Sequence, residues 1–254
     1  MGTYQPRMTP AIRLLLILMG LGFVLQLALT QFANIPMPQI FGFAPAAFFF
    51  KGWLWQIFTY PFLHGGLGHI LMNCVVLYMF GTELELRWGT LRFLKYFAVC
   101  AIGGAVLQTL VWIVSLFFFP SQSVMLGAIP IIGASGAIYG FFVAFARLFG
   151  ERQVLVFFVL PMRARTFVLI LAVVELISAV FYSEGGVAHL VHLGGLLTGF
   201  LYLKWKGNDL SGGGGGFFSR KPKQRMSREE LRKRMSVIVN NEPNDPGKFP
   251  VTWN

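Results

Sequence analysis

Two residues in the apolar part of this chain could together perform nucleophilic chemistry, namely Ser135 and His192. A serine hydroxyl attacks poorly until a base removes its proton, and histidine is the usual base. Ser135 follows a loop that contains Pro130 and stands where a helix is expected to begin, next to free N–H groups and the positive end of the helix dipole. The alternative is that Ser135 only caps this helix.

Glycine spacing suggests that the two residues lie close together. Glycines four residues apart follow both of them: Gly136 and Gly140, and Gly195 and Gly199. Small residues at this spacing let helix backbones approach closely in a membrane. We therefore expect the two helices to meet and to hold Ser135 and His192 at a similar depth. His189, one turn further out, is interpreted as a rim residue.

Other polar residues in apolar segments are candidates for supporting roles. His69 and Asn73 are four residues apart, so they share one helix face, and both can donate hydrogen bonds to an oxyanion. Their alternative role is hydrogen bonding between helices. Tyr139 lies one turn from Ser135 and could stack on the His192 ring, or could simply pack in the core.

The remaining polar groups do not complete a further site. Glu175 is the only acid well inside a predicted span, and nothing else in its helix places it near His192. We interpret it as a protonated hydrogen-bond partner between helices. A third alternative, a metal transporter or metalloprotease, is prompted by the four histidines His64, His69, His189 and His192. His189 and His192 have an i,i+3 spacing that could share a metal, but there is no HExxH motif and no carboxylate beside them. The sequence therefore predicts neither a metal nor another cofactor.

These residues belong to a chain whose composition is that of a membrane protein. Of its 254 residues, 56% are hydrophobic and only 12% are charged, and the mean hydropathy is +0.65. Apolar stretches of suitable length predict six spans, at about 11–30, 67–83, 93–118, 134–149, 166–182 and 187–203. The fourth and sixth are short and contain glycine, which suggests that other helices enclose them. The predicted fold is an all-α bundle of six transmembrane helices.

The distribution of charge predicts the orientation of the bundle. With six spans, every Lys and Arg except Lys51 falls on the side that holds both termini. Basic residues favour the cytoplasmic side, so both termini are predicted to be cytoplasmic. The net charge of +11 is thereby attributed to topology and lipid contact, and no nucleic-acid partner is expected.

The chain divides into a cytoplasmic N-terminus (1–10), the six-helix core (11–205) and a basic tail (206–254). Within the tail, a run of glycines at 212–216 precedes a short predicted amphipathic helix, and the tail is either drawn to an anionic leaflet or solvated. The aromatic loop at 31–66 is expected to lie along the membrane surface. The segment 153–160 is interpreted as a surface or re-entrant piece. The absence of a long targeting peptide favours a bacterial plasma membrane.

Taken together, these residues resemble the rhomboid family of intramembrane serine proteases over about 10–205. The sequence Gly133-Ala134-Ser135-Gly136 is similar to the GxSG nucleophile motif of that family. Further similarities are His69-x-x-x-Asn73, the small residues around His192-Leu-Gly194-Gly195, and Glu85-x-Arg87-x-Gly89. One departure is visible, because the first loop has Trp55-Gln56 where the family usually has Trp-Arg, and this change would weaken the anchoring of the loop.

The resemblance implies a role for each matching residue. Ser135 would be the nucleophile and His192 the general base, while His69, Asn73 and the Ser135 N–H would line the oxyanion hole. Tyr139 would support the His192 ring. It also implies that Glu85 and Arg87 brace a cytoplasmic turn.

The resemblance further implies that the substrates are transmembrane proteins within the lipid bilayer, cleaved in or beside a membrane-spanning helix. The alternative function is that of a catalytically silent relative that binds transmembrane helices.

Overall fold

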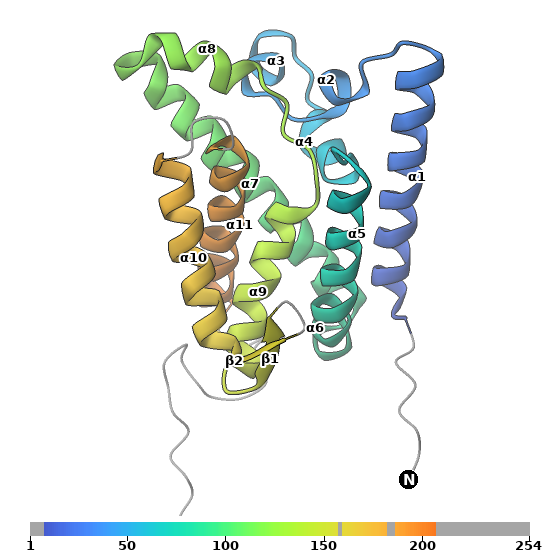
Figure 1. The fold of residues 1–254 in the computed structure, drawn as a ribbon, viewed down its shortest axis with the longest axis vertical. Helices are drawn as coiled ribbons and strands as arrows, with labels where there is room; N and C mark the ends of the chain where they lie inside the picture. The colour runs from blue at the N-terminus through green and yellow to red at the C-terminus, as the bar shows by residue number, and fades with distance from the viewer. Residues whose placement is uncertain (1–7, 157–158, 182–185, 207–254) are drawn as a thin grey trace, which may run out of the picture. The chain divides into compact units, whose positions relative to one another are not determined.

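The computed structural model describes residues 8–156, 159–181 and 186–206 of the chain. Five helical segments in this part are long and apolar enough to cross a membrane. They are α1 (Pro10–Phe32), the segment Leu67–Trp88, α7 (Thr90–Phe118), α10 (Ala164–Phe181) and α11 (Gly186–Trp205). Together with the shorter apolar helix α9 (Ser135–Phe149) they form the helical bundle that the sequence predicts (Figure 1). The fourth helix is short as expected, with 15 residues, whereas the sixth has 20.

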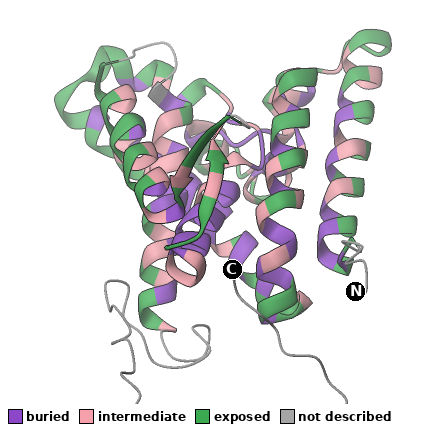
Figure 2. Ribbon diagram, turned by 60° about the horizontal axis from the view of Figure 1, so that its bottom comes forward, coloured by how far each residue is buried: buried purple, intermediate pink, exposed green. Residues whose placement is uncertain are grey.

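Helix α9 is the most enclosed element of the bundle. It contacts α7, α10 and α11, and also α5 (Leu67–Val76). Ten of its fifteen residues are buried. Exposed residues gather instead on the outward faces of the long helices, as Figure 2 shows. The short helix therefore carries Ser135 into the interior of the bundle.

Close backbone contact joins α9 to α11, as the glycine spacing predicts. A Cβ added to Gly195 would lie 1.8 Å from the carbonyl oxygen of Gly136, and one added to Gly199 would lie 3.0 Å from the Cα of Gly140. On its other side α11 meets α7, where a Cβ on Gly194 would lie 2.7 Å from the Cα of Gly104. Glycine thus allows α11 to pack tightly between α7 and α9.

The second span contains a change of helix type. After α5 the chain makes a π-helical turn, η2 (Leu77–Gly81), and continues as α6 (Thr82–Trp88). Glu85 on α6 is buried, and its carboxylate accepts the N–H groups of Ala11 and Ile12 at 2.9 and 3.1 Å. These are free N–H groups in the first turn of α1, so Glu85 ties that helix end to α6. Arg87 lies in the last turn of α6.

The loop between α1 and α5 is built from short helical pieces. They are α2 (Met37–Phe41), α3 (Pro45–Phe50), α4 (Gln56–Thr59) and the 3-10 turn η1 (Tyr60–Phe62). Gln56 is fully buried, accepts the Ala44 N–H at 3.1 Å and donates to the carbonyl oxygens of Gln39 and Ile40 at 3.1 and 3.2 Å. The glutamine amide can both donate and accept hydrogen bonds, so Gln56 itself connects three parts of this loop.

Two connections complete the described part of the chain. Helix α8 (Pro120–Ala128) follows α7 and precedes α9 along the chain. The segment interpreted as a surface or re-entrant piece is a surface hairpin of β1 (Gln153–Val156) and β2 (Leu160–Arg163), which pair antiparallel. The predicted amphipathic helix of the tail lies outside the described residues.

Candidate active site

Ser135 is the first residue of α9, and the bend before it positions its side chain. Gly133 has a φ of +113°, a conformation that favours glycine, and its N–H donates to the Tyr60 carbonyl at 2.9 Å. The helix cap position is Ala134, which has no side-chain oxygen, so Ser135 is not the N-cap. The hydroxyl is therefore available for a partner outside its own helix.

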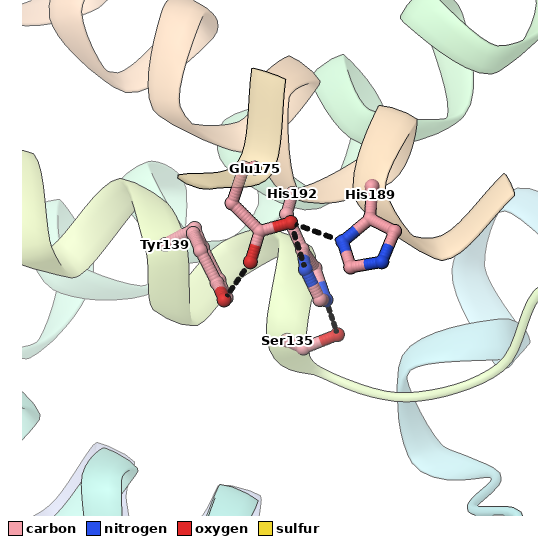
Figure 3. A network of polar contacts seen from close by, with 5 residues as sticks. All are labelled: Ser135, Tyr139, Glu175, His189 and His192. Carbon is pink, nitrogen blue, oxygen red and sulfur yellow. Dashed lines mark hydrogen bonds and ion pairs between the residues drawn. The ribbon is translucent and has the colours of Figure 1, made fainter. Parts of the chain in front are cut away.

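That partner is His192 on α11. The Ser135 Oγ lies 2.8 Å from the His192 Nε2, a normal hydrogen-bond distance (Figure 3). The Tyr139 ring stacks on the imidazole with a centroid distance of 4.1 Å and an interplanar angle of 8°. The contact between α9 and α11 thus brings together the serine, the histidine and the tyrosine that the sequence analysis singled out.

Glu175 on α10 lies at the centre of the same cluster, as Figure 3 shows. Its Oε1 accepts a hydrogen bond from the Tyr139 hydroxyl. Its Oε2 lies 2.6 Å from the His189 Nδ1 and 3.2 Å from the His192 Nδ1. The expectation that nothing places Glu175 near His192 is wrong. His189, interpreted as a rim residue, is partly exposed and also contacts this carboxylate.

A positional signal in the sequence could have found this acid. Glu175 stands seven residues before position 182, and His192 stands seven residues after position 185. Two consecutive antiparallel helices place residues equally far from their connection at the same depth. In addition, an acid inside a membrane span needs a partner, because burying it alone is costly.

His69 and Asn73 approach the serine from the opposite side, on α5. A Cβ added to Gly133 would lie 2.7 Å from the His69 Nε2 and 3.5 Å from the Asn73 Nδ2. The His69 Nδ1 accepts the Gly65 N–H at 3.3 Å, so a neutral His69 carries its proton on Nε2. The Asn73 Nδ2 is buried without a hydrogen-bond partner. Both side chains therefore present nitrogen donors beside the Ser135 loop.

The four histidines form two separate pairs in the structure. His64 is fully buried and its ring meets His69 edge to face, with centroids 5.0 Å apart. Burial, followed by the neighbouring His69, lowers the pKa of His64 from 6.5 to about 4. The other pair, His189 and His192, lies with Glu175. The chain therefore does not gather all four imidazoles in one place.

Three groups of the second pair could serve as metal ligands. The ligand atoms of Glu175, His189 and His192 all lie within 4.8 Å of one another. The statement that no carboxylate accompanies these histidines is therefore wrong, and the set fits zinc in the type of its ligands. However, the 2.6 Å separation of the His189 Nδ1 from the Glu175 Oε2 is that of a hydrogen bond. The same atoms thus satisfy one another.

The chain is thus of the class of multi-pass membrane proteins that hold a serine hydroxyl and a histidine imidazole in contact inside a helical bundle, the two groups that a serine hydrolase uses. A family model described as "Rhomboid domain" matches residues 51–207, more than half of the chain. The chain belongs to the rhomboid family.

Named relatives agree with this assignment. The chain is 31% identical over 150 residues to RHOMBOID-like protein 4 of Arabidopsis thaliana, and the aligned region covers 58% of this chain and 32% of the relative. It is also 31% identical over 142 residues to Rhomboid protein 1, mitochondrial, of Saccharomyces cerevisiae, and this aligned region covers 56% of this chain and 38% of the relative. The Rhomboid protease GluP of Bacillus subtilis is 28% identical over 151 residues, covering 59% of this chain and 25% of the relative.

The relatives also limit what can be carried over. The chain spans only about a third of the length of the first two relatives named here, at 32% and 38%. These relatives come from a plant and a yeast, and the yeast protein is named as mitochondrial. The expectation of a bacterial plasma membrane is therefore not supported, whereas residence in a membrane is.

Proposed function

We propose that this chain is an intramembrane serine endopeptidase that hydrolyses peptide bonds in or next to transmembrane segments of other proteins. The observation that carries the proposal is the 2.8 Å contact between the Ser135 Oγ and the His192 Nε2. Membership of a family with a relative named as a protease supports it. No cofactor and no nucleic acid takes part.

The first half of the reaction follows from the positions of the donors and acceptors. The Ser135 Oγ attacks the substrate carbonyl carbon while the His192 Nε2 takes the hydroxyl proton. The oxygen of the tetrahedral intermediate is stabilised by the N–H groups of His69 Nε2 and Asn73 Nδ2 and by the backbone N–H of Ser135. That backbone N–H belongs to the first turn of α9, where the helix itself supplies no partner.

The second half releases both products. His192 returns its proton to the leaving amine, which breaks the peptide bond and leaves an acyl group on Ser135. Water then attacks the ester, with His192 again as the base, and the free serine is restored. A substrate helix must unwind locally first, because an intact helix holds its carbonyl groups in hydrogen bonds.

The proposal is tested with purified full-length protein in lipid vesicles. We expect a fluorophosphonate to label the wild type and a transmembrane reporter protein to be cleaved, and both activities to be lost in S135A. The matched control is S115A, since Ser115 bonds only the Trp112 carbonyl in its own helix. Cleavage by folded S135A would overturn the proposal. A folded wild type that neither labels nor cleaves, but retains transmembrane partners, would establish the silent helix-binding function instead.

A further inference from the structure

The Glu175 cluster contains more than the two residues that the proposed reaction needs. Glu175 is buried, with 6% of its side chain exposed, and α10 contributes no second acid to the site. Both carboxylate oxygens are engaged, one by the Tyr139 hydroxyl and the other by two imidazole nitrogens. A buried acid held in this way inside a membrane bundle has a specific use or a specific cost.

The contacts of His192 indicate which use. Its Nε2 faces the Ser135 Oγ at 2.8 Å, and its Nδ1 faces the Glu175 Oε2 at 3.2 Å. The His192 Nδ1 is buried without a hydrogen-bond partner among the described residues, and the Glu175 Oε2 lies within ion-pair distance of it. A base that must receive a proton on Nε2 needs its other proton on Nδ1, and an acceptor at Nδ1 selects that tautomer.

We infer that Glu175 is a positioning residue that turns the Ser135–His192 pair into a serine–histidine–glutamate triad. This inference rests on the proposed function and adds a residue to its mechanism. When the Ser135 proton moves to the His192 Nε2, the imidazolium keeps its Nδ1 proton. That N–H then forms a hydrogen bond with the Glu175 carboxylate, without transfer of the proton. Glu175 stays ionised throughout, and the proton on Nε2 goes to the leaving amine.

Two neighbours hold the carboxylate in place for this task. The Tyr139 hydroxyl donates to Oε1 while the Tyr139 ring stacks on His192, so one residue aligns both the acid and the base. His189 binds the same Oε2 at 2.6 Å and is 28% exposed at its side chain. His189 therefore lies between the triad and the surroundings of the bundle, and shares the acid with the base.

Other titratable groups near His192 are few in the described part of the chain. Helix α9 presents Ser135 and Tyr139, α10 presents Glu175, and α11 itself carries His189. Helix α5 presents His69, which interacts electrostatically with His192. Helix α7 presents Tyr96 and Cys100, which pack near Gly199, two turns further along α11. Glu175 is the one carboxylate in this set.

The test is the pH profile of kcat/KM for a transmembrane reporter in vesicles, for wild type, E175Q, E175D and H189Q. E175Q is expected to lose about 100-fold in kcat with little change in KM, and its acid limb should move to lower pH, because the imidazolium has lost its negative partner. E175D retains the charge and should recover about 10-fold of this loss with a wild-type acid limb. H189Q should lose less than E175Q, because the acid and the base remain while one of the two groups that hold the carboxylate is removed.

A matched control separates charge at this site from charge in general. Glu83 pairs with Arg152 at 2.5 Å on the surface, so E83Q should leave the rate and the profile unchanged. If the wild type cleaves the reporter, and a folded E175Q has the same kcat and the same acid limb, the triad inference is overturned while the proposed function stands. A wild type that does not cleave would instead remove the proposed function.

A measurement on the unmodified chain covers the case in which E175Q does not fold. The chain has four histidines, so ¹⁵N-histidine spectra of the wild type can be assigned with single substitutions. We expect neutral His192 to carry its proton on Nδ1 with Nε2 bare. A neutral His192 protonated on Nε2 would overturn the inference, since no proton would then face Glu175.

Discussion

The two sides of Ser135 use polar groups in opposite ways. On the α5 side, the Asn73 Nδ2 is buried without a partner and the His69 Nε2 points at the Gly133 backbone. On the side of α10 and α11, Tyr139 and His189 hydrogen-bond to Glu175, and His192 hydrogen-bonds to Ser135 through Nε2 while its Nδ1 lies 3.2 Å from the same carboxylate. The comparison teaches that unfilled donors suit a charge that appears during the reaction, whereas satisfied groups suit a base that must be ready beforehand.

The largest expected effect is on the satisfied side. H192A removes the base, so kcat should fall by about a thousandfold or more while the bundle stays folded. Single-turnover cleavage in vesicles measures the loss, and circular dichroism checks the fold. A loss smaller than that caused by changing Asn73 would reverse the ranking of the two sides.

A smaller loss is expected on the unfilled side. N73D keeps the size of the side chain but replaces its N–H donors by carboxylate oxygens, so kcat should fall by about 100-fold with KM nearly constant. Steady-state kinetics with the same reporter gives both constants. If KM alone rises, Asn73 binds the substrate rather than the oxyanion, and the proposed division between the two sides fails.

The contact that joins α9 to α11 can be weakened without touching either polar side. In G195A a methyl group would meet the Gly136 carbonyl oxygen at 1.8 Å, so we expect a destabilisation of about 1–3 kcal/mol together with slower fluorophosphonate labelling. The matched control is G20A, because a Cβ on Gly20 meets nothing within 4 Å. Unfolding in detergent of graded strength measures both variants, and equal stability would show that the close contact is dispensable.

The α5 side also contributes a dependence of stability on pH. Because the pKa of His64 is about 4 when folded and about 6.5 when unfolded, the unfolded chain binds the extra proton between these values. Stability should therefore fall as the pH falls from 6.5 to 4, by at most roughly 3 kcal/mol. In H64L, stability should no longer fall for this reason between pH 6.5 and 4. At pH 8, where His64 is neutral, the slope of stability against pH should be the same in H64L and the wild type, and thermal unfolding measures both. An unchanged slope would assign it to other groups.

The smallest effect is expected from chelation. If the groups of Glu175, His189 and His192 satisfy one another, a strong chelator should leave cleavage unchanged, and metal analysis of the active protein should find less than one equivalent. Loss of activity that added zinc restores would show instead that the satisfied side is a metal site.

The sequence revealed the residues of the site better than their partners. Ser135 and His192 could be paired because glycine spacing shows which helix faces can touch, and the structure has these faces in contact. Glu175 was missed, since the periodicity of one helix says nothing about the rotation of that helix against its neighbours. The hydrogen bonds of Gln56 could not be predicted, because they depend on how the loop folds around its amide. The π-helical turn at Leu77–Gly81 left no pattern that could have predicted it.

The 15 residues of α9 also make this helix shorter than the hydrocarbon layer is thick. A helix of that length extends about 22 Å, whereas the hydrocarbon layer is roughly 30 Å thick. Because neighbouring helices enclose α9, the lipid need not thin around it, and this difference of about 8 Å leaves an end of α9 below the headgroups. Ser135 occupies one of those ends. In the proposed reaction, a peptide bond and a water molecule must therefore descend below the headgroups to meet the hydroxyl.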